Sequence, residues 1–160
     1  MTFDPDPMPR NFVGYGRRPP MVTWPGGARF ALNFAINYEE GAEYSFPDDG
    51  RNETHGVSYT MPVGVRDLRL ESMYEYGSRV GVWRVMRLFE EYDVKVTFFA
   101  SAVAIERNPE VGALIREQGH EVAGHGWRWI DAWRLTEDEE RDGIRKAVTS
   151  LERTCGHRPV

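Results

Sequence analysis

The sequence contains a single cysteine and lacks both an excess of basic residues and any long apolar run. Cys155 has no partner for an internal disulfide, which favours the reducing cytoplasm. With a net charge of −5 the chain has no electrostatic attraction for nucleic acid or for an anionic membrane. The opening MTFDPDPMPR lacks the basic start and apolar core of a signal peptide, and no stretch is apolar enough to cross a bilayer. We expect a cytoplasmic protein that binds neither nucleic acid nor membrane.

What is present describes a globular domain preceded by an arm. The 160 residues are 41% hydrophobic and 28% charged, which is enough to bury a core. Residues 1–28 are rich in proline, glycine and arginine and follow neither the helical nor the strand period. We interpret them as an extended arm that packs on the domain or on a neighbouring subunit.

From residue 29 onward, segments typical of strands and of helices alternate. The expected strands cover 30–38, 94–104 and 120–126, and the expected helices cover 79–92, 108–119 and 136–156. This order predicts an α/β fold with a parallel sheet and helical crossovers. Three such units do not close a barrel, and the final GHRPV falls where another strand is expected. We therefore expect 29–160 to form the first βα units of a domain that continues beyond the sequence.

Polar and aromatic side chains follow the first and the third expected strand. They are Glu39, Glu40, Glu43, His125, Trp127 and Trp129. Because the carboxyl ends of parallel strands meet at one edge of a sheet, these side chains are candidates for a shared site. A carboxylate there can act as a base, and an aromatic ring can wall the slot of a flat ligand. The plain alternatives are a solvated acidic turn, a hydrogen-bonded histidine and core tryptophans.

Several longer motifs carry a resemblance to a known family. They are the arm FVGYGRRPPMVTWPGGARFAL, the turn NYEEGAE, the segment LESMYEYGSRVGVWRVMRLF, the strand VTFFA and the run GHEVAGHGWRWID. In these motifs the chain resembles the polysaccharide deacetylase (NodB-homology) superfamily and, within it, the PuuE-type allantoinases. The resemblance covers essentially the whole sequence and implies the N-terminal portion of a distorted (β/α) barrel.

The resemblance also implies roles for the site residues. Deacetylases of the superfamily carry two aspartates after the first strand and a His-x-x-x-His pair that completes a metal site. Here Glu39 and Glu40 align with the aspartates, His125 with the first histidine and Trp129 with the second. An indole has no lone pair to offer a metal, so we expect no bound cofactor; if a divalent metal such as zinc binds, its ligands are Glu40 and His125.

Three hypotheses about function follow. The first is an allantoinase-like hydrolase that opens a hydantoin ring, with Glu39 or Glu40 as the base, Glu40 slightly preferred, and His125 orienting water or stabilising the oxyanion. In it Trp129 walls the ring's slot, and Glu43 and Trp127 border the substrate. The second is a metal-dependent deacetylase of peptidoglycan or chitin fragments, and the third an inactive barrel that serves as a scaffold or binding module. Assembly as a homotetramer is implied by the resemblance.

Overall fold

The computed structural model describes residues 12–54, 57–58 and 60–160, so the first eleven residues of the expected arm lie outside this part of the chain. The chain divides into two compact units, residues 1–32 and 33–160. In the first unit, the described residues form one short 3-10 turn, η1 (Pro25–Gly27), and are otherwise without helix or strand. The boundary at residue 32 lies four residues beyond the expected end of the arm at residue 28.

The second unit is built on a parallel sheet of three short strands, in the order β1 (Ala35–Tyr38), β2 (Thr97–Ala100) and β3 (Glu121–Gly124). The register aligns Tyr38 with Ala100 and Ala100 with Gly124, so the three strands end at the same level. Beyond β3, Val160 donates its N–H to Val122 O (3.1 Å) and accepts from Gly124 N–H (3.3 Å). The residues after the last helix therefore extend the sheet on this side.

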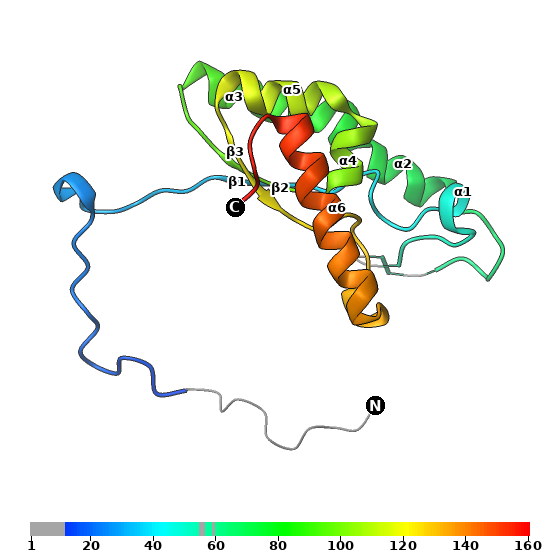
Figure 1. Ribbon diagram of the computed structural model, residues 1–160, viewed down its shortest axis with the longest axis horizontal. Coiled ribbons are helices and arrows are strands. Elements are labelled where there is room, and N and C mark those ends of the chain that lie inside the picture. Colours follow the sequence, from blue (N-terminus) through cyan, green and yellow to red (C-terminus); the bar gives the residue numbers. More distant parts are fainter. Residues whose placement is uncertain (1–11, 55–56, 59) are drawn as a thin grey trace. The chain divides into compact units, whose positions relative to one another are not determined.

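Helices connect the strands, and Figure 1 shows most of them gathered on one side of the sheet. Their bounds are α1 (Phe46–Asp49), α2 (Leu68–Tyr76), the π-helical turn η2 (Gly77–Gly81), α3 (Val82–Glu91), α4 (Ala102–Arg107), α5 (Pro109–Gln118), the 3-10 turn η3 (Ala132–Arg134) and α6 (Glu137–Cys155). The expected α/β fold with a parallel sheet is confirmed. No described helix has the length and apolar character that a membrane crossing requires.

The two faces of the sheet differ sharply in burial. Tyr38, Phe98 and Val122 point toward the helices and are at most 1% exposed. On the opposite face, Asn37, Phe99 and Glu121 are exposed. The core therefore lies between the sheet and the helices, and the alternation of side chains along each strand decides which residues enter it.

Among the helical segments that the sequence did not predict, α2 and α4 matter most for the site. The helix expected at 79–92 is preceded by α2, which Asp67 caps by accepting the Leu70 N–H (3.0 Å), and the π turn joins the two. Two glycines flanking that turn, Gly77 and Gly81, obscure the continuity because glycine weakens a helix. Likewise the strand expected to reach residue 104 ends at Ala100, because α4 begins directly after Ser101.

The ends of α5 and α6 show which of the capping residues in the sequence form cap hydrogen bonds in the structure. The spacing of Thr136 and Glu139 predicts a capping box, which the structure contains, and Gly156 adopts the left-handed conformation (φ 82°) that ends α6. Asn108 occupies the N-cap position of α5, but its side chain makes no cap bond. It donates instead to the Tyr38 hydroxyl (3.0 Å) and to Ser78 O (3.1 Å), tying α5 to the end of β1.

Candidate active site

The structure brings Glu39 and His125 together at the carboxyl edge of the sheet. His125 Nε2 lies 2.8 Å from Glu39 Oε1, and the two side chains are 35% and 18% exposed. By alternation both residues continue the open face of the sheet, Glu39 after Asn37 and His125 after Ala123. The pair is thus partly shielded from solvent and still reachable by a small molecule.

Glu40 takes the opposite direction. Its carboxyl group lies against the backbone of Gly77, where an added Cβ would come within 2.5 Å of Glu40 Cδ. It borders a cavity of about 540 Å³ together with Arg79 and Trp83, away from the open face of the sheet. The residue that the sequence favoured as base, and as a metal ligand beside His125, is therefore not the one that contacts the histidine. Strand alternation separates the two neighbouring glutamates.

The backbone of His125 is held by its neighbours in the sheet. Its N–H donates to Ala100 O (3.0 Å), and the Ser101 hydroxyl donates to His125 O (3.1 Å). Ser101 follows β2 at the same edge, but it is fully buried, so its hydroxyl supports the histidine and does not face a ligand. The imidazole is thus mounted on a rigid strand end.

Glu43 folds back onto the turn that it belongs to. Its Oε2 accepts the Gly41 N–H (2.6 Å), and the residue is 8% exposed. Burial raises the pKa of its carboxyl group, although the hydrogen bonds from the turn act in the opposite direction. Position and partners make Glu43 a brace of the turn that carries Glu39.

The two tryptophans of the GWRW run are placed differently. The backbone N–H of Trp129 donates to Ala42 O (3.0 Å), and the indole lies 6.1 Å from the Tyr74 ring at 49°. Trp127 packs against the core, and a Cβ added to Gly143 of α6 would lie 3.9 Å from its Cβ. Trp129 therefore belongs to the neighbourhood of Glu39, and Trp127 packs toward α6 while also lining the cavity beside His125.

Tyr74, from α2, is a site neighbour that the sequence did not reveal. Burial and then the charges of Glu53, Glu43, Glu39 and Glu40 raise its pKa to about 12, so the hydroxyl stays protonated at neutral pH. A protonated phenol is a hydrogen-bond donor. The available signal was the position of Tyr74 in YEY, but its helix was not expected, so nothing placed it at the sheet edge.

Two cavities border this region. One, of about 560 Å³, is lined by His125 and Trp129 and by apolar side chains that include Ile130, Leu135 and Ile144. That volume and lining suit a small organic molecule. The helical spacing of Ile144, Val148 and Leu151 predicts a buried stripe on α6. Leu151 is buried as predicted, but Ile144, on the cavity wall, is 55% exposed, and Ala147 is buried in its place.

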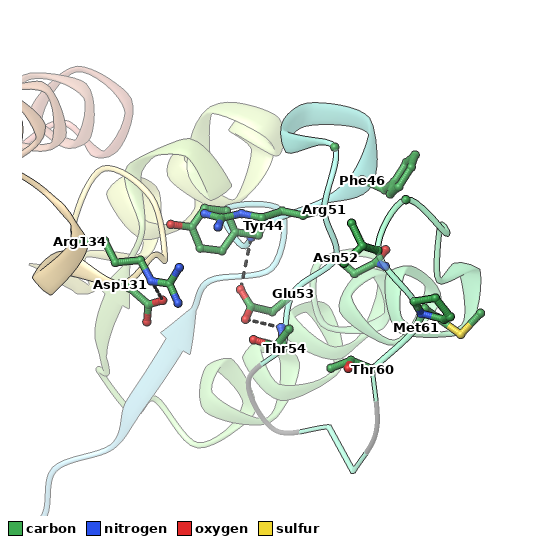
Figure 2. A pocket seen from close by; sticks show the side chains of 14 residues that line it. Tyr44, Phe46, Arg51, Asn52, Glu53, Thr54, Thr60, Met61, Asp131 and Arg134 are labelled. Carbon is green, nitrogen blue, oxygen red and sulfur yellow. Dashed lines mark hydrogen bonds and ion pairs between the residues drawn. The ribbon is translucent and has the colours of Figure 1, made fainter.

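The other cavity, of about 320 Å³, is lined by residues from 44–54 and 60–64 together with Asp131 and Arg134 (Figure 2). Arg51 stacks over the Tyr44 ring (3.5 Å), and Arg134 pairs with Asp131 (2.8 Å). The buried Glu53 accepts the Thr54 N–H (2.6 Å). These side chains largely contact one another.

A catalytic metal needs about three protein ligands. Glu39 and His125 could supply two, and among the residues the structure describes no third His, Cys, Asp or Glu joins them in a group able to hold a metal. Trp129 offers no lone pair. The described residues alone do not fit a complete metal site.

With this geometry in place, comparison with known proteins identifies the family. A model of the family described as polysaccharide deacetylase matches residues 66–160, more than half of the chain. The chain belongs to this family. It is 36% identical over 135 residues to a Schizosaccharomyces pombe protein described as "Putative polysaccharide deacetylase", covering 81% of this chain and 42% of that protein.

Two solved structures share the fold over nearly the whole chain. A probable polysaccharide deacetylase from Pseudomonas aeruginosa is 45% identical with a TM-score of 0.85, covering 95% of this chain and 52% of the other. PuuE allantoinase is 42% identical with a TM-score of 0.84, covering 96% and 52%. The chain thus spans about half the length of these relatives. Its fold is that of the NodB type seen in both.

Proposed function

We propose that the protein containing this chain is an allantoinase-like hydrolase, which opens the hydantoin ring of allantoin to give allantoate. The observation that carries the proposal is the Glu39–His125 contact of 2.8 Å, with Trp129 beside it at the position of the second histidine of the deacetylase pattern. The similarity to PuuE allantoinase over 96% of the chain supports it.

The proposed chemistry is attack of water on a ring carbonyl. One oxygen of Glu39 is held by His125, which leaves the other to accept a proton from the attacking water. The new carbon–oxygen bond gives a tetrahedral oxyanion. When the ring carbon–nitrogen bond breaks, the proton on Glu39 passes to the departing nitrogen, and the product is a carboxylic acid with an open-chain N–H. The acid then releases its proton to solvent to give the carboxylate, so atoms and charge balance without a further reactant.

Neighbouring groups have supporting roles in this proposal. His125 fixes the carboxylate of Glu39 through Nε2 and so orients the base. Trp129 supplies a flat wall for the ring in the 560 Å³ cavity. Tyr74, protonated at neutral pH, supplies a hydrogen-bond donor near the glutamates and a partner ring for Trp129. The same proposal includes a cytoplasmic location and assembly as a homotetramer.

A second candidate is a metal-dependent N-deacetylase acting on peptidoglycan or chitin fragments. The names of the Schizosaccharomyces pombe and Pseudomonas aeruginosa relatives favour it. In that case Glu39 and His125 would be two of the metal's ligands, and the others would lie outside the described residues.

One experiment separates these candidates. The full-length protein is assayed for allantoin ring opening and for release of acetate from N-acetylglucosamine oligomers, each with and without chelator, while its metal content is measured. Chelator-insensitive ring opening supports our proposal. Acetate release that chelator abolishes, with stoichiometric metal, supports the second candidate. If the protein shows neither activity, that result supports the inactive scaffold and overturns both enzymatic candidates.

A further inference from the structure

Arg128 joins the two chain segments that carry the catalytic pair. It lies three residues after His125, in the segment that follows β3. Its guanidinium donates to Asp49 Oδ1 (2.7 Å) and Oδ2 (2.8 Å). Asp49 ends α1, in the segment that begins with Glu39. The same group therefore connects the ends of two strands that are not adjacent in the sheet.

Arg128 also binds backbone of the Glu39 segment. Nη2 donates to Glu43 O (2.6 Å), and Nε donates to Ala42 O (3.3 Å). Ala42 O also accepts the N–H of Trp129 (3.0 Å). One carbonyl, three residues after Glu39, is thus held by two groups from the His125 segment.

The contact is partly buried and matched in charge. The side chains of Arg128 and Asp49 are 22% and 16% exposed. The Arg128 guanidinium lowers the pKa of Asp49, chiefly by hydrogen bonding, and the Asp49 carboxylate raises the pKa of Arg128 in the same way. The rigid fork of a guanidinium can meet a carboxylate and two carbonyls at once, whereas an ammonium group has three donors on a flexible stem.

Arg107 offers an internal comparison. It too binds this segment, donating to Gly41 O (2.5 Å) and pairing with Asp48 (2.6 Å), but it comes from α4. Its side chain is 46% exposed and that of Asp48 37%, so water screens the pair. Only Arg128 shares its segment with His125 and is well shielded.

We propose that Arg128 is a positioning residue for the Glu39–His125 pair: by holding Asp49 and the carbonyls of Ala42 and Glu43, it fixes the distance between the Glu39 turn and the end of β3. The proposal rests on the proposed function only in taking that pair as the catalytic one. Arg128 also lines the 560 Å³ cavity, but its guanidinium bonds go to Asp49 and to the carbonyls of Ala42 and Glu43. It acts on the pair through backbone, and small displacements of a base cost rate steeply.

The test uses Arg128→Lys, Arg128→Met and Asp49→Asn in the full-length protein. Asp49→Asn removes the ion pair and leaves the carbonyl contacts in place. Arg141→Met is the matched control, because Arg141 pairs with Glu137 on α6 (2.7 Å), both side chains are largely exposed, and neither lines the cavity beside His125. The first readout is the ring ¹⁵N shifts of His125 in histidine-labelled protein, assigned with His125→Gln, with Glu39→Gln as the unpaired reference.

The second readout is steady-state kinetics of ring opening. For Arg128→Met we expect His125 shifts close to those of Glu39→Gln and a fall in kcat of about 10- to 100-fold, with KM changed much less. Arg128→Lys should recover part of both effects, Asp49→Asn should lie between, and Arg141→Met should match wild type.

A folded Arg128→Met variant with wild-type His125 shifts overturns the proposal. If Arg128→Met does not fold, the Arg128→Lys and Asp49→Asn shifts decide in the same way. If the wild-type protein opens no hydantoin ring, the proposed function fails, but the His125 shifts still test the positioning role.

Discussion

The two faces of the sheet differ in role: one packs into the core, and the other leads to the candidate site. On the face covered by helices, Tyr38, Phe98 and Val122 are almost completely buried, and each strand contributes to one continuous core. On the open face, Phe99 is 38% exposed, and the continuation of that face carries Glu39 and His125. One residue along a strand therefore separates a side chain that stabilises the fold from one that can meet a ligand.

The two adjacent glutamates show this most directly. Glu39 continues the open face and contacts His125, whereas Glu40 turns to the Gly77 backbone. Their identical chemistry gives the sequence no means of choosing between them. The geometry of the strand end selects Glu39 as the partner of His125, and substituting each glutamate in turn tests that selection.

The largest effect should come from Glu39→Gln. The amide keeps the shape of the carboxylate but cannot accept the proton of water, so we expect kcat for ring opening to fall by about 10²–10⁴-fold. The free energy of unfolding should change little, because the side chain is partly exposed. Steady-state assays and denaturant unfolding of the same preparation measure both quantities.

Glu40→Gln is the matched control for that substitution. We expect it to reduce kcat by less than about 10-fold, far below the contribution of a general base. If Glu40→Gln instead proves as damaging as Glu39→Gln, both carboxylates take part, and the assignment of the base to the open face is wrong.

On the covered face we expect a large effect on stability, not on the rate, from truncating a core residue. Phe98 is fully buried in the core, and Phe98→Ala should lower the free energy of unfolding by about 3–5 kcal/mol. Phe99→Ala, one residue along, removes a ring that is 38% exposed and should cost clearly less. Urea unfolding of the two variants gives the difference, and equal losses would show that the open face is also packed.

Sequence reasoning found the sheet and most of the later helices because their signals are local. Apolar runs marked β2 and β3, and Thr136, Glu139 and Gly156 marked the ends of α6. It missed α2, whose apolar pattern is weak and whose link to α3 passes through a glycine-flanked π turn. Without α2, Tyr74 could not be placed near the glutamates.

The sequence predicted candidate residues for the site but not the contacts between them. The rule that chemistry gathers at the carboxyl ends of parallel strands selected Glu39, Glu40 and His125. Which glutamate meets the histidine depends on where β1 ends relative to β3, and that register is a tertiary property. Arg128 carried no signal of its own, because its partners lie 79 and more positions away in the sequence.

Gly77→Ala should affect stability less, and it tests whether the position of the Glu40 side chain matters for the reaction without substituting Glu40 itself. An added Cβ would overlap the Glu40 carboxyl group, so that flexible side chain must move. The higher helix propensity of alanine, about 1 kcal/mol, offsets part of the cost, and we expect the stability to change by no more than about 1 kcal/mol. Ring opening should stay near the wild-type rate. A rate loss as large as that of Glu39→Gln would indicate that Glu40 takes part in the reaction.

A last effect of similar, small size should be a pH dependence of stability on the covered face. His120 is buried, its ring lies 5.9 Å from that of Phe98, and its Nδ1 accepts the Val96 N–H (3.4 Å). Burial, with a smaller contribution from Lys95, lowers the pKa of His120 below its usual value. Protonation is therefore easier in the unfolded chain, so the stability that the neutral ring provides is present above about pH 6.5 and is lost as the pH falls below it, by at most about 1.4 kcal/mol per pH unit. His120→Gln should remove this part of the pH dependence, which urea unfolding at pH 8 and pH 5.5 can measure. If wild type and variant lose stability in parallel on acidification, protonation of His120 does not couple to folding, and the pH sensitivity belongs to other groups.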